Sequence, residues 1–326
     1  MAALWGKSGI VGLEFDEGAI RGVEIVKKGS VLSVTAYAQV AVGEDAIKEG
    51  VILDEGAVAA ALEELWAKGT FRSREVVTGV SNQGVIIRFA RFPKVTPNRL
   101  DSLIRFQAQE HLPVPLDTVY LDYDVIGTRS DGEREMLEIL LVAGRKEMVQ
   151  GFLQVLTMAR LRPKEIEVLP LTLLRFLKKE DASRQVVAAI DIARGVSNMV
   201  IADAGKPRLA RMMATGMAAA ELLAAAREED TGASEVNLHR EQFANSIQAT
   251  IGFYQSHKDA RPVEKIFLSG IGSQVTGLAE RLESMLRLPV KQVRPAEVLG
   301  LKLGGGPHED FVKFGLAAGL ACRGWE

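Results

Sequence analysis

Two acidic residues have the types and spacing that could do chemistry. Each follows an apolar run and precedes a glycine-containing turn: Glu14 comes before Gly18, and Asp191 comes before Gly195. Carboxylates at strand ends can hold Mg²⁺ through water, and such turns can offer backbone N–H groups to phosphate. The two segments therefore suggest a site for a nucleotide with Mg²⁺.

The two segments correspond to each other along the chain. Asp191 stands 177 positions after Glu14, and Gly195 stands the same distance after Gly18. In each segment, runs of strand-type residues flank the turn, which predicts a β-hairpin. A repeat with a period of about half the chain predicts two similar domains rather than a solenoid.

A third turn, at residues 268–273, follows another apolar run and contains two glycines, which would let an adenosine lie flat on the backbone. Each turn taken alone is better explained by an ordinary loop of an α/β protein. The order of the three turns and the repeat favour a shared nucleotide-binding fold. The candidate nucleotide-binding residues are Gly12, Glu14, Gly18, Asp191, Gly195, Gly270, Gly272 and Ser273.

Other groups that could carry chemistry give a weaker signal. The histidines are scattered without the spacing of metal ligands. They are His111, His239, His257 and His308. Asp122 and Asp124 lie two residues apart on the same face of one predicted strand. A solvent-exposed face explains this pattern better than a catalytic pair. We therefore predict no metal site and no catalytic residue.

The elements that must position these turns form two domains. In the first, residues 1–184, three strands at 11–40 precede a helix capped by Asp54 and a strand at 76–81. Residues 87–164 then form a β-α-β-β-α block, which we interpret as an inserted subdomain of this α/β domain with a mixed sheet.

The second domain, residues 185–326, follows a polar stretch at 178–184 and begins with the second hairpin. Further strands are predicted at 207–213 and 265–269, and helices at 217–229, 240–257 and 278–286. We expect a glycine-rich helix at 311–323 to pack back on the first domain.

Composition restricts the class of protein. The chain has 326 residues, a formal net charge of −2 and a pI near 6.2, so it has no general attraction for nucleic acid. Its one cysteine, Cys322, can form no internal disulfide, which indicates a reducing compartment. The sequence shows no signal peptide and no run of about 20 apolar residues. We expect a cytoplasmic protein that reaches the membrane through a partner, without inserting directly.

Several stretches resemble the PilM family of type IV pilus assembly proteins, which is related to the cell-division protein FtsA. The stretches include RFPKV at 91–95, QAQEHLPVPLDTVYLDYDV at 107–125, IEVLPLTLLRFL at 166–177, IFLSGIGSQVTGLAERL at 266–282 and FGLAAGLACRG at 314–324. The resemblance implies a two-lobed, actin-like (ribonuclease H-like) α/β fold. It also implies an inserted subdomain at about 87–164. The segment 216–265 is shorter than in the family, which implies a reduced fourth subdomain.

The resemblance further implies a cytoplasmic scaffold of the inner-membrane platform of a type IV pilus or a related secretion system. PilM binds the cytoplasmic N-terminal tail of the membrane protein PilN between the first and inserted subdomains. A PilN-like protein and other platform proteins would be the partners here. We expect the binding site near residues 88–116, with the candidates Arg88, Phe89, Arg91, Phe92, Pro113 and Pro115.

The sequence departs from the family at all three nucleotide turns. Asp16 and Glu17 stand where the family has Gly-Ser. Ala193 replaces a glycine of the second turn, and Ile271 interrupts the glycine pair of the third. Because carboxylates repel phosphates, we expect binding of ATP with Mg²⁺ to be weak or lost and turnover to be negligible. Mg²⁺ bound at Asp16, or the charge of Arg194, would preserve residual binding.

Two other functions are compatible with this fold. An actin-like ATPase or small-molecule kinase would need intact phosphate turns. A protein like FtsA would carry an amphipathic membrane-binding helix after a linker, whereas this sequence stops at Glu326, directly after the last predicted helix. We therefore expect a scaffold and not an enzyme.

Overall fold

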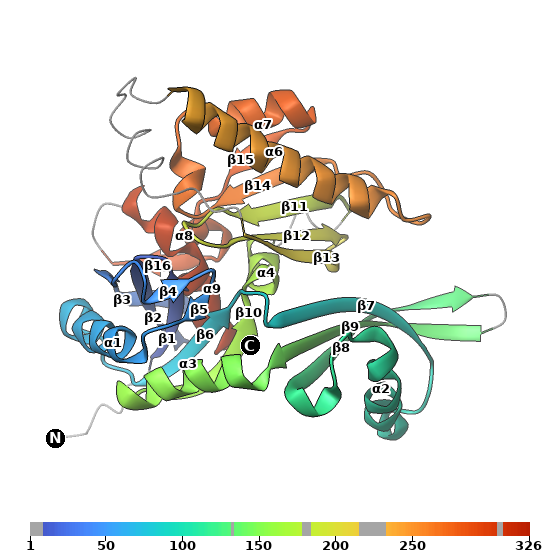
Figure 1. The fold of residues 1–326 in the computed structure, drawn as a ribbon, viewed down its shortest axis with the longest axis horizontal. Helices are drawn as coiled ribbons and strands as arrows, with labels where there is room; N and C mark the ends of the chain where they lie inside the picture. Colours follow the sequence, from blue (N-terminus) through green and yellow to red (C-terminus); the bar gives the residue numbers. More distant parts are fainter. Residues whose placement is uncertain (1–8, 132–133, 178–183, 215–232, 305–308) are drawn as a thin grey trace.

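Two lobes and a projecting subdomain make up the computed structural model (Figure 1). It describes residues 9–131, 134–177, 184–214, 233–304 and 309–326. The predicted helix at 217–229 lies outside these residues, as does nearly all of the polar stretch at 178–184. Each lobe is built on its own β-sheet, and a three-stranded sheet forms the projecting subdomain.

The first lobe contains a six-stranded mixed sheet in the order β10-β6-β1-β2-β3-β16. Its strands are β1 (Ile10–Asp16), β2 (Ala19–Lys28), β3 (Val31–Ala41), β6 (Glu75–Val80), β10 (Arg162–Val168) and β16 (Leu301–Leu303). The first two form the predicted hairpin, and its turn favours glycine because Gly18 has a φ of +71°. A small ribbon of β4 (Ile47–Lys48) and β5 (Val51–Ile52) lies beside it.

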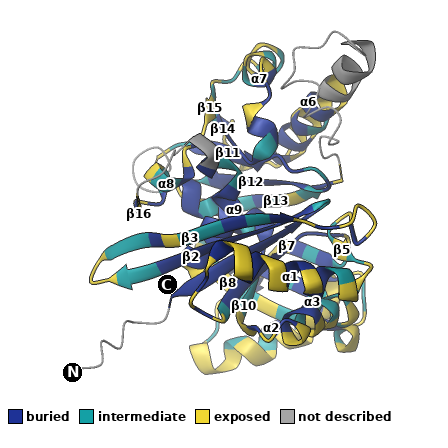
Figure 2. Ribbon diagram, turned by 90° about the vertical axis from the view of Figure 1, so that its left-hand side faces the viewer, coloured by how far each residue is buried: buried dark blue, intermediate teal, exposed yellow. Residues whose placement is uncertain are grey.

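Helices cover both faces of this sheet, so β1 is buried along its whole length. On one face lies α1 (Glu55–Gly69), whose start Asp54 caps as predicted by accepting the Ala57 N–H at 2.9 Å. On the other face lies α9 (Gly315–Arg323), which contacts β1 and β2. Figure 2 shows buried residues concentrated in the sheets and exposed residues on the outward sides of the helices.

The second lobe contains a five-stranded sheet in the order β13-β12-β11-β14-β15. Its strands are β11 (Val186–Asp191), β12 (Ser197–Asp203), β13 (Lys206–Met213), β14 (Lys265–Ser269) and β15 (Val290–Gln292). On one face pack α6 (Ala233–Gln255) and α7 (Leu278–Leu286), whose residues Phe243, Ile247 and Leu282 share a core with alternate residues of β11. Helix α6 begins at Ala233, before the predicted start at residue 240.

A hydrophobic core joins the two lobes. Its helical elements are α4 (Leu169–Thr172), η2 (Leu173–Leu177), α8 (Pro295–Val298), η4 (Glu309–Phe314) and α9. In this core Phe176 and Leu320 pack with Val187, a residue on the other face of β11. The second-lobe sheet is thus buried on both faces, like the first.

The internal repeat is present in the pairing of the strands. Glu14 lies opposite Arg21 in the first hairpin, and Asp191 lies opposite Asn198 in the second, at the same offset along the chain. Each leading strand also pairs in parallel with a later strand, β1 with β6 and β11 with β14. The residues of the sequence repeat therefore occupy corresponding strand registers in the two lobes.

The projecting subdomain contains β7 (Val85–Pro93), α2 (Pro97–His111), η1 (Leu116–Thr118), β8 (Val119–Asp131) and β9 (Arg134–Arg145). The strand order is β7-β9-β8, and α2 covers part of one face. The next helix, α3 (Lys146–Met158), completes the predicted β-α-β-β-α order. Its residues Phe152 and Val155 pack into the core of the first lobe together with Phe15.

Candidate functional site

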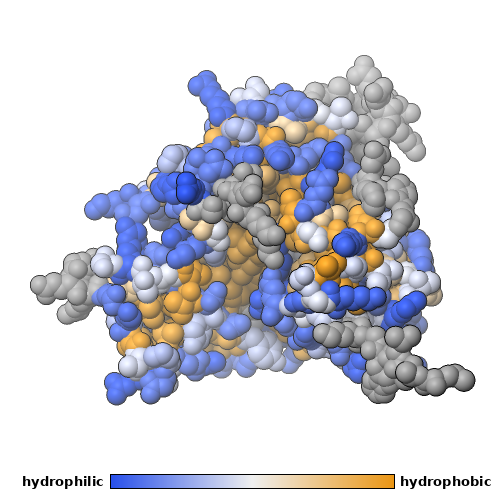
Figure 3. All heavy atoms as spheres, turned by 180° about the vertical axis from the view of Figure 1, so that it is seen from behind, coloured by the Kyte–Doolittle hydropathy of each residue, from blue (hydrophilic) through white to orange (hydrophobic). Residues whose placement is uncertain are grey.

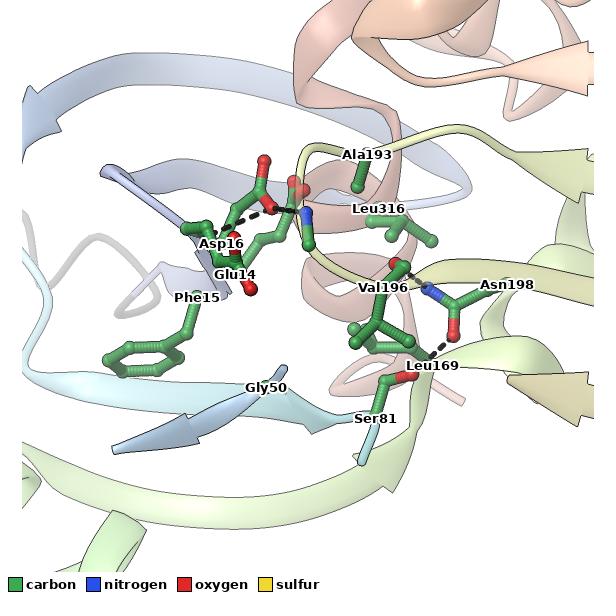
Figure 4. Close-up of a pocket in the computed structure, with 12 residues that line it drawn as sticks. Glu14, Phe15, Asp16, Gly50, Ser81, Leu169, Ala193, Val196, Asn198 and Leu316 are labelled. Carbon is green, nitrogen blue, oxygen red and sulfur yellow. Dashed lines mark hydrogen bonds between the residues drawn. The ribbon is translucent and has the colours of Figure 1, made fainter. Parts of the chain in front are cut away.

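The two hairpin turns face each other across the cleft between the lobes (Figure 4). Residues lining this cleft include Glu14, Asp16, Ser81, Ala193, Gly195 and Asn198. The cavity volume is about 20 Å³, enough for about one water molecule, whereas pockets for small ligands measure about 300–1,000 Å³. The space between these two turns is nearly filled by the chain's own atoms.

Asp16 reaches from the first turn to the second. One carboxylate oxygen, Oδ1, accepts hydrogen bonds from the N–H of Glu17 at 2.9 Å and of Gly195 at 3.3 Å. The other oxygen, Oδ2, accepts a weaker one from the N–H of Arg194 at 3.5 Å. Backbone N–H groups in such a turn are the donors that an anion would use, so here a side chain of the same protein uses them.

A buried arginine pairs with two acids of the cleft. Arg21 Nη1 lies 2.8 Å from Glu14 Oε1 and 3.2 Å from Asp16 Oδ2, and its Nε donates to Gln39 Oε1 at 3.1 Å. Arg21 is only 1% exposed. An ion pair in this setting avoids the large cost of leaving any one of these charges buried alone.

Glu14 and Asp191 have unusual acid–base properties. Burial raises the pKa of Glu14 to about 8 and that of Asp191 to about 7, although Arg21 opposes both shifts. Within the described part of the chain, Glu14 Oε2 and Asp191 Oδ1 have no hydrogen-bond partner. Each acid therefore keeps one oxygen that a proton can occupy at neutral pH.

The third turn, η3 (Ile271–Gln274), packs directly on the end of β11. A Cβ at Gly272 would lie 2.2 Å from Ile192 Cγ2, and one at Gly270 would lie 2.9 Å from Asp191 Oδ1. Ser273 Oγ donates to the carbonyl of Gly270 at 2.7 Å, so its hydroxyl is used within the turn. The turn packs so closely on the second lobe that a side chain has no room at either position, and this packing explains the two glycines.

The structure brings four of the predicted nucleotide-binding residues together at the two facing turns and places the three residues of the third turn on the end of β11. Glu14, Asp191 and Gly195 lie at the facing turns. A Cβ at Gly18 would lie 3.0 Å from Arg194 Nη1. Gly12 lies elsewhere, on β1, where it allows the close approach of α9.

The two facing turns do not fit the phosphates of Mg-ATP, the cofactor that an actin-like fold implies. The N–H groups that a phosphate would need are bonded to Asp16, and the cavity holds about one water molecule. Among the described residues, no three metal-ligating side chains gather as a metal site requires. We therefore assign no chemical step to a nucleotide.

Sequence reasoning missed three residues of the cleft. Arg21 lies on β2, directly opposite Glu14. Ser81 Oγ donates to Asn198 Oδ1 at 2.5 Å, and both residues are buried. The repeat could have indicated two of them, because Arg21 and Asn198 occupy corresponding positions opposite the two acids.

The candidate partner residues fall on two faces of the projecting sheet. Arg88, Pro113 and Pro115 are exposed on the side of α2. Phe89, which is 36% exposed, and Arg91 lie on the other face, where Arg91 Nη2 is 3.6 Å from Asp259 Oδ2 of the second lobe.

Phe92 has a different position from the other candidates. It is fully buried in the core between α2 and the projecting sheet, where its ring lies 5.3 Å from the His111 ring. Phe92 thus supports the surface without being exposed on it.

The proline-containing loop after α2 is held in a fixed shape. Gln109 Nε2 donates to the carbonyl of Val114 at 3.1 Å, and Gln109 Oε1 accepts from the N–H of Leu116 at 3.3 Å. Val114 and Leu116 also pack against the buried apolar cluster that contains Ala108 of α2. The loop therefore presents Pro113 and Pro115 in a preorganised conformation.

The sequence also matches a family model described as type IV pilus assembly protein PilM, over residues 12–219, which is more than half of the chain. The chain belongs to the PilM family of type IV pilus assembly proteins. This finding confirms the predicted family, and with it a role in type IV pilus assembly.

Solved structures agree with this assignment. A chain of a PilM–PilN type IV pilus biogenesis complex is 25% identical, has a TM-score of 0.83 and matches over 97% of this chain and 98% of its own length. The ethanolamine utilization protein EutJ from Carboxydothermus hydrogenoformans is 15% identical, with a TM-score of 0.53 over 95% of this chain and 88% of its own. The cytoplasmic domain of EpsL, from the type II secretion system of Vibrio cholerae, is 10% identical, with a TM-score of 0.50 over 98% and 95%.

These likenesses confirm the predicted actin-like α/β fold. In the part of the chain that the structure describes, no helix is both long and apolar enough to span a membrane.

Proposed function

We propose that this protein is a scaffold of the type IV pilus inner-membrane platform and binds the cytoplasmic tail of a PilN-like membrane protein. One observation carries the proposal: nearly the whole chain is similar to a chain of a PilM–PilN complex, at a TM-score of 0.83. The likeness extends over both lobes and the projecting subdomain. A peptide tail suits a protein whose own cleft is nearly filled.

We place the tail against the projecting subdomain. The exposed prolines of the fixed loop, and Arg88 and Phe89 of β7, offer apolar and polar contacts over both faces of an edge strand. Seen from behind, hydrophobic side chains lie in patches on both halves of the molecule, including the half that holds this subdomain, and around a hollow between them (Figure 3). An extended peptide could use such a surface with little reorganisation of the protein.

Binding of synthetic tail peptides to the full chain tests this placement. The peptides come from bitopic membrane proteins encoded with this chain, and calorimetry measures their affinity. We expect Phe89→Ala and Arg88→Glu each to weaken binding about tenfold, whereas Arg105→Glu, an exposed control on the outer side of α2, should not. Point variants are preferable to deleting residues 87–164, because α3 fills the core of the first lobe.

Undiminished binding by a fragment containing only the second lobe would contradict the placement. Failure of every platform tail to bind the intact chain would contradict the scaffold proposal itself.

An actin-like ATPase is the alternative function, and the filled cleft disfavours it. We propose that the protein has no catalytic activity. Phosphate release from Mg-ATP should equal the rate of a buffer blank, with and without the tail peptide. Release that rises with protein concentration and is lost in Asp191→Asn would favour the ATPase.

A further inference from the structure

A side chain of the first lobe occupies the place where a nucleotide phosphate would meet the second turn. We propose that Asp16 is a built-in substitute for that phosphate and holds the two lobes closed without any nucleotide. We call this contact, between Asp16 and the N–H groups of Arg194 and Gly195, the Asp16 latch. The proposal goes beyond the scaffold function and does not depend on the identity of the partner.

The latch places a carboxylate on the backbone donors that an anion would use, at long hydrogen-bond distances. The Asp16 carboxylate accepts from the N–H of Gly195 at 3.3 Å and of Arg194 at 3.5 Å, and from Glu17 in its own turn at 2.9 Å. Asp16 is 5% exposed, so water competes little for these donors. The second turn therefore already has its acceptor.

The two turns are in direct contact around the latch. A Cβ at Gly195 would lie 2.6 Å from Glu17 Cγ, so no larger residue fits there without movement of the Glu17 side chain. Glu17 is held from the other side, because its Oε1 accepts the N–H of Glu49 at 2.7 Å. A nucleotide phosphate would have to separate surfaces that already touch.

The charges around Asp16 stabilise the closed arrangement. Arg21 Nη1 and Nη2 lie 3.2 and 3.3 Å from Asp16 Oδ2, and Arg21 also binds Glu14. Displacing Asp16 would therefore leave the buried guanidinium with fewer partners. In this chain, nucleotide binding and lobe closure compete with each other.

Other contacts between the lobes support the same arrangement. At the cleft, Ser81 Oγ donates to Asn198 Oδ1 at 2.5 Å. At the projecting sheet, Arg208 Nη1 lies 2.8 Å from Glu138 Oε2, and Asp259 Oδ1 lies 2.8 Å from Arg129 Nη2. These ion pairs hold the projecting subdomain against the second lobe in the same closed arrangement.

Hydrogen–deuterium exchange of the full chain tests the latch, followed by mass spectrometry of peptides that cover residues 192–197. In the wild type we expect slow exchange at Arg194 and Gly195, unchanged by Mg-ATP. Asp16→Ala removes the acceptor and should accelerate exchange there about tenfold or more, since a hydrogen bond to a charged group contributes about that factor. Asp45→Ala, an exposed control in the same lobe, should not.

Two outcomes of this experiment would overturn the proposal. One is wild-type exchange rates in Asp16→Ala, and the other is slower exchange of the wild type when Mg-ATP is added. Should Asp16→Ala fail to fold, Asp16→Asn keeps the size and one carbonyl oxygen of the side chain. Its exchange at the turn should still be faster than wild type, and an equal rate would also overturn the proposal.

A gain of binding provides an independent test. The double variant Asp16→Gly/Glu17→Ser removes the latch and restores the glycine and hydroxyl expected from the family. By calorimetry, we expect a wild-type dissociation constant for Mg-ATP of about 1 mM or weaker and a value at least about tenfold tighter in the double variant. Wild-type binding at about 10 μM or tighter, or no gain in the double variant, would contradict the role of Asp16.

Discussion

Glu14 links the stability of the cleft to pH. Burial raises its pKa from 4.5 to about 8, so the folded chain holds a proton that the unfolded chain releases in between. The free energy of unfolding should therefore fall as pH rises from about 5 to about 8, by on the order of a few kcal/mol, and level off above that range. Asp191 adds a change of the same sign up to about pH 7. Urea unfolding at about pH 6 and about pH 8.5 measures the change.

Glu14→Gln is the matched variant for this prediction. It keeps an oxygen that can accept from Arg21 but cannot titrate, so its stability should change less between the two pH values. If the wild type and Glu14→Gln lose the same stability, the raised pKa of Glu14 is not the cause.

Gly12 illustrates a close approach that no other residue allows. A Cβ there would lie 1.9 Å from the carbonyl oxygen of Ala317 in α9. Gly12→Ala should therefore push α9 away from β1 and destabilise the protein by about 3 kcal/mol or more, because the clash is with backbone. Chemical denaturation measures this. Gly43→Ala, where no atom lies within 4 Å of the added Cβ, is the control and should change stability by less than about 0.5 kcal/mol.

The cleft shows how far residue types alone predict a site. Glu14 and Asp191 were found because an acid before a glycine turn occurs twice at one offset. Asp16 was predicted to repel phosphate, but its contact with the second turn joins residues 178 and 179 positions apart. Sequence patterns of short range cannot predict such a contact, since it depends on how the lobes meet.

At the scale of elements, the loop after α2 should depend on Gln109. Gln109→Ala removes both hydrogen bonds that fix this loop, so it should weaken tail binding about three- to tenfold while the stability of the whole protein changes by less than about 1 kcal/mol. Calorimetry with the tail peptide measures the affinity. Glu110→Ala, an exposed neighbour on the same helix, should bind like wild type; equal affinity of the Gln109 variant would show that loop order is irrelevant.

Elements with a strong period were predicted well, and very short ones were not. Thr96 and Pro97 marked the start of α2, although the Thr96 hydroxyl bonds to Asn98 Oδ1 instead of capping the backbone. β15 and β16 contain three residues each, too few for a periodic pattern, and pairing in parallel with β14 and β3 defines them. The apolar face of α3 was visible in the sequence, but its partner, the first-lobe core, was not.

For the whole molecule, we predict that membrane association depends on a partner. The purified chain should not float with anionic vesicles at physiological salt, because none of its described helices could span the bilayer and its net charge is −2. Vesicles that carry a PilN-like tail should bring it to the top of a density gradient. Flotation with protein-free vesicles would contradict the prediction.

The contact between α9 and β1 sets an order for biosynthesis. β1 emerges from the ribosome early, yet the helix that covers one of its faces begins at Gly315, and β16, the edge strand beside β3, at Leu301. Trp325 Nε1 even donates to the carbonyl of Ile25, 300 positions earlier. During translation one apolar face of the first-lobe sheet therefore stays uncovered until the second lobe has been synthesised. The nascent chain is thus a natural client for chaperones that shield exposed apolar surface.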